Sequence, residues 1–172
     1  FYLFFPAKDY KGIFRIGVAV SDSPTGPFKA EPEAIKGSFS IDPAVFKDDD
    51  GAYYMYFGGL WAGQLQRWRT GSFNSDQAES PTAFLPADDE PALLPLVAKM
   101  SDSLLEFAET PKELEILDDK GNLLLSGDND RRFFEAAWLH KRNGKYYFSY
   151  STGDTHFICY ATVSYTHLTL PT

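Results

Sequence analysis

Two carboxylates stand at the head of the same sequence pattern, which occurs twice in the chain. Asp42 begins residues 42–57 and Glu135 begins residues 135–150, and the two stretches align without a gap at an offset of 135 − 42 = 93 residues. Each stretch runs from the acid through a short apolar segment and a charged turn ending in glycine to Tyr-Tyr and alternating aromatics. A repeated hairpin therefore carries one carboxylate at an equivalent position in both copies.

These two acids are of the type that hydrolysis of a glycosidic bond requires. One carboxyl group protonates the leaving oxygen, and a second activates water or attacks the sugar. Glu135 lies between Phe133-Phe134 and Ala136-Ala137-Trp138, and this apolar setting is expected to raise its pKa and to suit it as a general acid. Asp42 precedes Pro43, which fixes the local backbone and removes a donor. We expect Asp42 to stay ionised and to orient or tune the acid.

Each acid also has a purely structural interpretation. Asp-Pro commonly opens a turn, so Asp42 can serve the hairpin alone. Glu135 can form an ion pair with Arg131 or Arg132, which lie four and three residues before it, respectively. Their equivalence across the repeat favours a functional role over both structural ones.

The composition predicts strands and turns as the elements that position these acids. Aromatic residues make up 16% of the chain, and 13 Gly and 11 Pro separate its short apolar runs. Strand-like residues 13–20 and 97–100 are each followed by Ser-Asp-Ser, so they end units of one kind. Repeated units of about four strands predict an all-β fold of β-propeller blades, in which equivalent acids point toward one axis.

Charge and hydropathy exclude several classes of partner. The net charge of −8 and the pI near 4.8 argue against a nucleic-acid backbone, which requires a clustered positive face. No apolar run approaches the roughly 20 residues of a membrane span. The single cysteine, Cys159, leaves no internal disulfide. We therefore expect neither nucleic acid nor membrane as a partner, and nothing in the sequence predicts the oligomeric state or the localisation.

Five segments are interpreted without a role in chemistry. Residues 71–95 predict a long loop, and residues 114–125 predict a short hairpin of two apolar segments. The acid-rich residues 48–51 and 128–130 lack the full spacing of a calcium loop, so no metal is expected in this chain. Residues 163–172 match the translation of a transposon mosaic-end sequencing adapter, and we expect them to be an artefact.

Four motifs resemble a known family of enzymes. Residues 40–46 and 132–138, which contain the two acids, together with residues 58–61 and 149–153, resemble glycoside hydrolase family 43, the β-xylosidases and α-L-arabinofuranosidases. The resemblance extends over residues 1–162. It implies a five-bladed β-propeller, of which this chain would be a partial domain of about three blades. It also implies an inverting mechanism with three acids.

The resemblance assigns a role to each acid. It makes Glu135 the general acid and Asp42 the residue that tunes the pKa of that acid and holds its orientation. The general base of the family is an Asp on the inner strand of the first blade, which the repeat places roughly ten positions before Phe1. We therefore expect a fragment that is inactive by itself. No cofactor is expected in it, although the resemblance allows a structural ion in a full-length propeller.

Six further residues are candidates for contact with an oligosaccharide substrate. They are Trp61, Gln64, Arg132, Phe134, Thr152 and His156. Trp61 can stack on a sugar ring or fill the core, and Gln64 can bind sugar hydroxyls or lie exposed in a loop. Arg132 can shift the pKa of Glu135 or form a surface salt bridge. A lone histidine such as His156 is more often structural.

The main alternative is a non-catalytic carbohydrate-binding propeller, which would keep the aromatic residues without requiring both acids. A transferase or phosphorylase would require an anion site, for which Arg131-Arg132 is the available cluster. The sequence does not separate xylosyl from arabinofuranosyl specificity, because that choice depends on the shape of the pocket. The leading hypothesis is an inverting glycoside hydrolase that releases one of these two sugars from hemicellulose-derived oligosaccharides.

Overall fold

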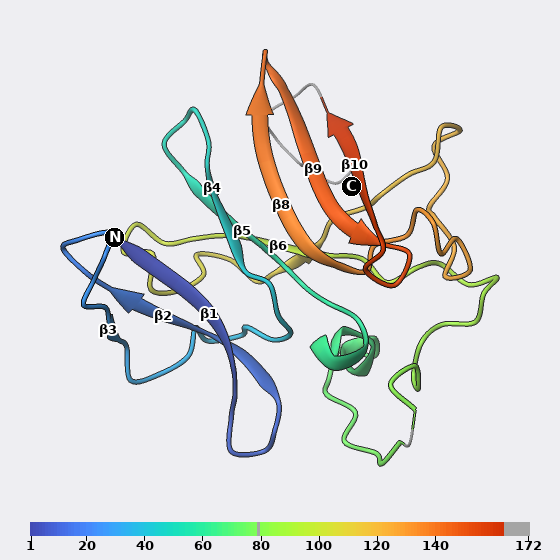
Figure 1. The fold of residues 1–172 in the computed structure, drawn as a ribbon, viewed down its shortest axis with the longest axis horizontal. Coiled ribbons are helices and arrows are strands. Elements are labelled where there is room, and N and C mark those ends of the chain that lie inside the picture. The colour runs from blue at the N-terminus through green and yellow to red at the C-terminus, as the bar shows by residue number, and fades with distance from the viewer. Residues whose placement is uncertain (79, 164–172) are drawn as a thin grey trace.

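The computed structural model describes residues 1–78 and 80–163 and shows an all-β protein, as the composition predicts. The strands are β1 (Tyr2–Lys8), β2 (Phe14–Val20), β3 (Lys29–Ala30), β4 (Ala44–Lys47), β5 (Tyr53–Phe57), β6 (Leu96–Lys99), β7 (Lys112–Glu113), β8 (Glu135–Arg142), β9 (Lys145–Thr152) and β10 (Phe157–Val163). They form three antiparallel sheets in the orders β1-β2-β3, β4-β5-β6-β7 and β10-β9-β8 (Figure 1). Within the described ranges, no helix is long and apolar enough to cross a membrane.

The two repeated stretches form the hairpins β4–β5 and β8–β9, which confirms the predicted pairing. Asn143-Gly144 forms the two-residue turn of the second hairpin, and both residues have the positive φ angles (52° and 74°) that such a turn requires. The first hairpin has a longer turn, which is closed by the hydrogen bond from Asp48 N to Ala52 O at 2.9 Å. Gly51 in this turn has a φ of 85°. The turn chemistry of both copies therefore explains where the strands reverse.

The acids of the first turn contact two side chains of the second hairpin, Lys141 of β8 and Tyr146 of β9. Tyr146 donates its hydroxyl to Asp48 Oδ1 at 2.7 Å, and Lys141 donates to the Tyr146 oxygen at 2.9 Å and to Asp49. These contacts hold the pKa of Lys141 well above its usual range, with the hydrogen bond from Lys141 to Asp49 as the main cause. The acidic run at residues 48–50 therefore serves a contact between hairpins.

One hydrophobic core joins the second and third sheets. Strands β4 and β5 lie against β8, and Tyr56 and Phe148 meet in this core with ring centroids 5.8 Å apart. Met55, Phe57 and Phe133 are almost fully buried in the same cluster. Because this core fixes the two hairpins against each other, the segments that precede β4 and β8 also lie side by side.

The irregular segments agree in part with the sequence. No helix or strand lies among the described residues of 71–95, as predicted for a loop. The hairpin predicted at residues 114–125 is reduced to a single bridge between Leu117 and Leu123, and both side chains are exposed. Two short 3-10 turns, η1 (Trp61–Gly63) and η2 (Leu65–Trp68), were not expected. Of the segment interpreted as an adapter, Val163 ends β10 and residues 164–172 lie outside the described residues.

Candidate active site

Glu135 is the first residue of β8 and lies half-buried at the junction of the second and third sheets. It pairs with Ser151 of β9, and the preceding Phe134 N donates to Ser151 O at 2.9 Å. Burial raises the pKa of Glu135, and the negative charge of Asp42 raises this pKa further. The apolar setting that the sequence predicts for Glu135 therefore exists, and it favours a carboxyl group that keeps its proton.

Asp42 is brought to the start of β8 although it lies 93 residues earlier in the chain. Its Oδ2 accepts a hydrogen bond of 3.0 Å from the backbone N–H of Ala136, the residue after Glu135. Ala136 has a φ of 58° and lies in a β-bulge, where Ala136 and Ala137 oppose the single residue Tyr150. Asp42 thus holds the backbone that sets the direction of the Glu135 side chain.

The arginines before Glu135 are engaged elsewhere. Arg131 pairs with Asp128 at 3.1 Å, and Arg132 Nη2 pairs with Asp154 at 3.5 Å. In the part of the chain that the structure describes, neither arginine forms an ion pair with Glu135. The ion-pair interpretation of Glu135 is therefore wrong, and the charge nearest to it that shifts its pKa is the like charge of Asp42.

A glycine-containing loop packs beside the acid. Gly59 lies so close that an added Cβ would be 3.3 Å from the Glu135 Cβ and 2.6 Å from Ile41 Cγ1, so a side chain at this position would clash. Leu60 N donates to Phe134 O at 2.9 Å and links the loop to the residue before the acid. The loop then turns into η1, which begins with Trp61.

Trp61 and Arg132 both contact the ring of Phe134, the residue before Glu135. The Trp61 ring meets the Phe134 ring edge to face with centroids 5.1 Å apart, and the Arg132 guanidinium lies 5.9 Å from the centre of the same Phe134 ring. Arg132 is only 6% exposed, which contradicts the alternative of a surface salt bridge. Its burial lowers its pKa. Trp61 Nε1 and Arg132 Nη1 are buried donors without a protein acceptor among the described residues.

Three predicted contact residues hold loops in place. The Gln64 amide accepts from Phe14 N at 3.0 Å and donates to Gly12 O at 2.9 Å, which ties the turn of the first sheet to the loop of Trp61. Thr152 is fully buried and donates to Asn129 O at 3.2 Å. His156 lies exposed in the turn after β9, with Nδ1 2.8 Å from Gly153 O. Direct contact of these three side chains with a substrate stays a prediction.

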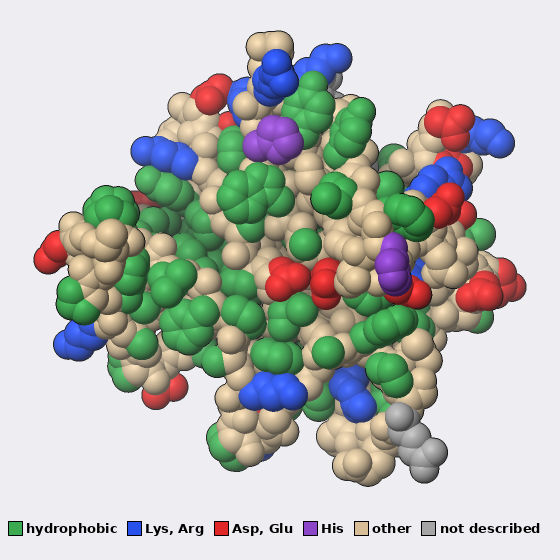
Figure 2. Space-filling model, in the orientation of Figure 1, with side chains coloured by type: hydrophobic (Ala, Val, Ile, Leu, Met, Phe, Trp, Pro, Cys, Tyr) green, Lys and Arg blue, Asp and Glu red, His purple; other side chains and the backbone are tan. Residues whose placement is uncertain are grey.

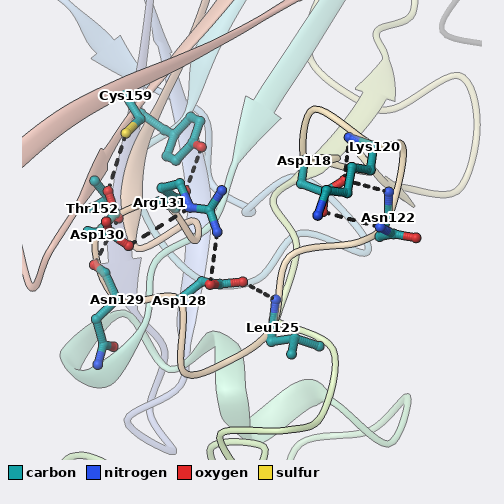
Figure 3. A network of polar contacts seen from close by, with 11 residues as sticks. Asp118, Lys120, Asn122, Leu125, Asp128, Asn129, Asp130, Arg131, Thr152 and Cys159 are labelled. Atoms are coloured by element: carbon teal, nitrogen blue, oxygen red, sulfur yellow. Dashed lines mark hydrogen bonds and ion pairs between the residues drawn. The ribbon is translucent and has the colours of Figure 1, made fainter.

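The segment that leads to Glu135 is held by a network of its own (Figure 3). Asp128 Oδ2 accepts from Leu125 N at 2.8 Å, and Cys159 Sγ donates to Asp130 O at 3.6 Å. Asn129 supports Arg132 through its side-chain oxygen, at 2.8 Å from Nη2. The described residues contain no group of three or more His, Cys, Asp and Glu that could hold a metal ion, so no residue here is assigned to an ion.

The residues that the sequence missed act mainly through the backbone or from buried positions. The N–H of Ala136, the side chain of Asn129 and the buried hydroxyl of Ser40 all support the site, yet none has a type or spacing that indicates chemistry. The signal in the sequence that could have indicated Ser40 is a polar residue directly before an apolar one, at residues 40–41. In Figure 2 acidic side chains gather near the centre of the visible face with hydrophobic side chains around them.

Comparison with known proteins finds similarity to one family of enzymes. The family model described as "Glycosyl hydrolases family 43" matches residues 1–80. A xylosidase/arabinosidase of Bacteroides ovatus is 59% identical over 162 residues, which cover 94% of this chain and 48% of that protein. Xylosidase/arabinosidase 43A of Humicola insolens is also 59% identical, over 92% of this chain and 49% of its own length. The chain thus spans about half the length of the curated relatives it matches.

Solved structures show the same relationship. CoXyl43, a family 43 β-xylosidase/α-arabinofuranosidase from a compost microbial metagenome crystallised with xylotriose, is 65% identical, and it superposes with a TM-score of 0.88 over 95% of this chain and 49% of its own. A family 43 enzyme from Xanthomonas citri superposes with a TM-score of 0.87 at 52% identity, over 95% of this chain and 49% of that one. Over 95% of its length the chain is thus similar in sequence and fold to solved enzymes of glycoside hydrolase family 43, and the model of that family matches residues 1–80.

Proposed function

We propose that this chain supplies two of the three acids of an inverting glycoside hydrolase, with Glu135 as the general acid and Asp42 as the residue that tunes and orients it. One observation carries this proposal. The carboxyl group of Glu135 is half-buried beside Asp42, and its pKa is raised by both burial and that charge. A raised pKa keeps a larger share of the Glu135 carboxyl groups protonated at a given pH, which makes the proton available for donation to the leaving oxygen of a glycoside.

Asp42 has two contributions in this mechanism. Its charge favours the protonated form of Glu135, and its hydrogen bond to Ala136 N fixes the bulge that follows the acid. A general acid must lie within hydrogen-bond reach of the atom that it protonates, so a fixed backbone beside Glu135 supports catalysis. The half-buried Trp61 ring supplies an aromatic surface against which a sugar ring can pack, and the buried Phe134 ring supports it edge to face.

The substrate is proposed to be an oligosaccharide derived from hemicellulose, from which a xylosyl or arabinofuranosyl unit is released. Relatives named for xylosidase and arabinosidase activity at 59% identity support this class, as does the xylotriose complex of CoXyl43. We further propose that the three sheets are blades of a five-bladed propeller. The water-activating base is then an Asp outside residues 1–172, and we expect no turnover by this chain alone.

The test is the Glu135→Gln substitution in a protein of the relatives' length that contains this chain. Gln keeps the size of the side chain and removes the proton, so hydrolysis of xylotriose and of arabinofuranosyl xylo-oligosaccharides, whose leaving groups are unactivated sugar hydroxyls that require protonation, should fall by about 10²- to 10⁴-fold. The matched control is Glu33→Gln, because Glu33 is exposed in a loop outside the site. Proton NMR of the first-formed sugar should show the inverted anomer.

Two results would contradict this function. Unchanged turnover in the Glu135→Gln variant would remove Glu135 from the mechanism. Binding of xylotriose without hydrolysis by the unsubstituted protein of full relative length would instead favour a carbohydrate-binding propeller.

A further inference from the structure

Ser40 lies two residues before Asp42 in a position that is demanding for its residue type. It is fully buried, with 0% of its surface exposed, and its φ of 65° is one that side chains other than glycine rarely adopt. Such a conformation at a buried polar residue requires compensation from the surrounding contacts. Those contacts all come from the loop that carries Trp61.

The Ser40 hydroxyl binds both ends of that loop. It accepts a hydrogen bond of 3.0 Å from Gly59 N and donates to Gly63 O at 2.7 Å. The next side chain, Ile41, fills the space beneath, where a Cβ on Gly59 would be 2.6 Å and a Cβ on Gly63 would be 2.8 Å from Ile41 atoms. Residues 59–63 therefore pack directly against Ser40 and Ile41, and there is no space for a side chain at Gly59 or Gly63.

The clamped loop connects three groups of the proposed site. Trp61 lies between the two clamped glycines, with a φ of 53° that is also demanding for its type. Leu60 N donates to Phe134 O at 2.9 Å, and Gly59 packs against Glu135. On the other side of Ile41, Asp42 binds Ala136 N. Ser40 thus holds the loop that carries Trp61, and Asp42, two residues later, holds the start of β8 beside Glu135.

We propose that Ser40 is a positioning residue of the active site, whose hydroxyl fixes the ring of Trp61 relative to Glu135. This inference rests on the proposed function only for its consequence in catalysis. The placement of Trp61 by Ser40 is a property of the chain itself. Ser40 acts through the loop and does not contact the reacting atoms.

The first experiment uses the 172-residue chain labelled with ¹⁵N. The chain has three tryptophan indole signals, and a Trp61→Phe variant assigns the one from Trp61. Ser40→Ala should shift or broaden the Trp61 indole signal and leave that of Trp138, an exposed residue of β8, unchanged. Ser40→Gly is the second variant, because glycine adopts the φ of 65° without strain, so the loss of the hydroxyl is tested without a backbone penalty.

The matched control is Ser38→Ala. Ser38 is equally buried, and its hydroxyl accepts from Ile16 N at 3.0 Å in the first sheet. Ser38→Ala loses one buried hydrogen bond and Ser40→Ala loses two, so the melting temperature should fall by about 2–4 °C in the first variant and by about twice as much in the second. Only the Ser40 variants should disturb Trp61. An unchanged Trp61 signal in both Ser40 variants, or an equal shift in Ser38→Ala, would overturn the inference.

The second experiment separates this inference from the proposed function. In a protein of the relatives' length, Ser40→Ala should raise the KM for xylotriose about tenfold and change kcat less, because a displaced Trp61 weakens sugar binding. An equal rise in KM with Ser38→Ala would indicate a general effect of lost stability and would contradict the role of Ser40. If Trp61 moves as expected but the unsubstituted protein hydrolyses no xyloside, the clamp stands and the proposed function fails.

Discussion

The hairpins β4–β5 and β8–β9 align in sequence without a gap, yet each places its irregular residue at a different end. In the first hairpin the turn of residues 49–51 is three residues long and Ala44 pairs directly with Tyr56. In the second the turn has two residues, and the additional residue forms the bulge after Glu135. A single residue has thus moved from the turn to the start of the strand.

This difference separates the roles of the two acids. The bulge leaves Ala136 N free of the sheet ladder, and Asp42 accepts its hydrogen bond. The Glu135 carboxyl group accepts no hydrogen bond within residues 1–78 and 80–163, whereas that of Asp42 does. One acid is therefore used to hold the backbone and the other is left available for proton transfer. Equivalent positions in a repeat do not imply equivalent roles.

The largest expected effect comes from separating the charge of Asp42 from its hydrogen bond. Asp42→Asn keeps an oxygen that can accept from Ala136 N and removes the charge that raises the pKa of Glu135. In a protein of the relatives' length, we expect turnover of xylotriose, whose leaving group requires protonation, to fall by about 10²-fold. Asp42→Ala loses both the charge and the hydrogen bond, so its turnover should be lower still. Equal activities of the two variants would show that the charge alone matters.

The contact between the first turn and strands β8 and β9 can be broken without changing Asp42 or Glu135. Tyr146→Phe removes the hydroxyl that links Asp48 and Lys141 and leaves the buried Asp48 carboxylate with fewer donors. The free energy of unfolding should fall by about 2 kcal/mol in urea denaturation of the chain. Tyr147→Phe, at the neighbouring position on the opposite face of β9, serves as the control and should cost less. A similar loss for both would argue against the link.

The bulge itself is tested by Ala136→Gly. Ala136 has a φ of 58°, which costs alanine about 1 kcal/mol that glycine does not incur. The variant should therefore keep or gain up to about 1 kcal/mol of stability in the same denaturation experiment. Ala137→Gly, at the buried neighbour with an ordinary backbone, should lose stability instead. Loss of stability in both would mean that the bulge is not present in solution.

The smallest effect is the pH dependence contributed by Glu135. Because its pKa is raised in the folded state, Glu135 contributes stability below its ordinary pKa near 4.5, and this contribution is lost as the pH rises through the folded-state pKa. Glu135→Gln removes this dependence. Melting temperatures of the two proteins should differ little at pH 4, and the Gln variant should melt higher at pH 7. A variant that is less stable at pH 7 would contradict the raised pKa.

The sequence predicted the sheets and the pairing of the acids because both follow from local patterns. Alternating aromatics and Asn143-Gly144 determine a hairpin whatever surrounds them, and the 93-residue offset identified Asp42 with Glu135. The apolar neighbours Phe133 and Phe134 correctly indicated a raised pKa for Glu135. These predictions needed no knowledge of contacts between distant segments.

The remaining features depend on such contacts and could not be predicted. A gapless alignment contains no information on the bulge at Ala136, because the shorter turn compensates for it in length. The burial of Arg132 depends on Asn129 and Asp154, and the engagement of Gln64 depends on a turn about 50 residues away in sequence. The short hairpin predicted at residues 114–125 is less extensive than expected, because the apolar side chains of Leu117 and Leu123 remain exposed and the two residues form a single bridge.

The central claim is that burial and the charge of Asp42 together raise the pKa of Glu135 above its ordinary value. It is tested most directly by a ¹³C NMR titration of the Glu135 side-chain carboxyl in the 172-residue chain and in its Asp42→Asn variant. The account predicts a pKa of Glu135 above 4.5 in the unsubstituted chain, and a lower pKa in the variant that stays above 4.5 because burial remains. An ordinary pKa in the unsubstituted chain, or one that Asp42→Asn leaves unchanged, would contradict it.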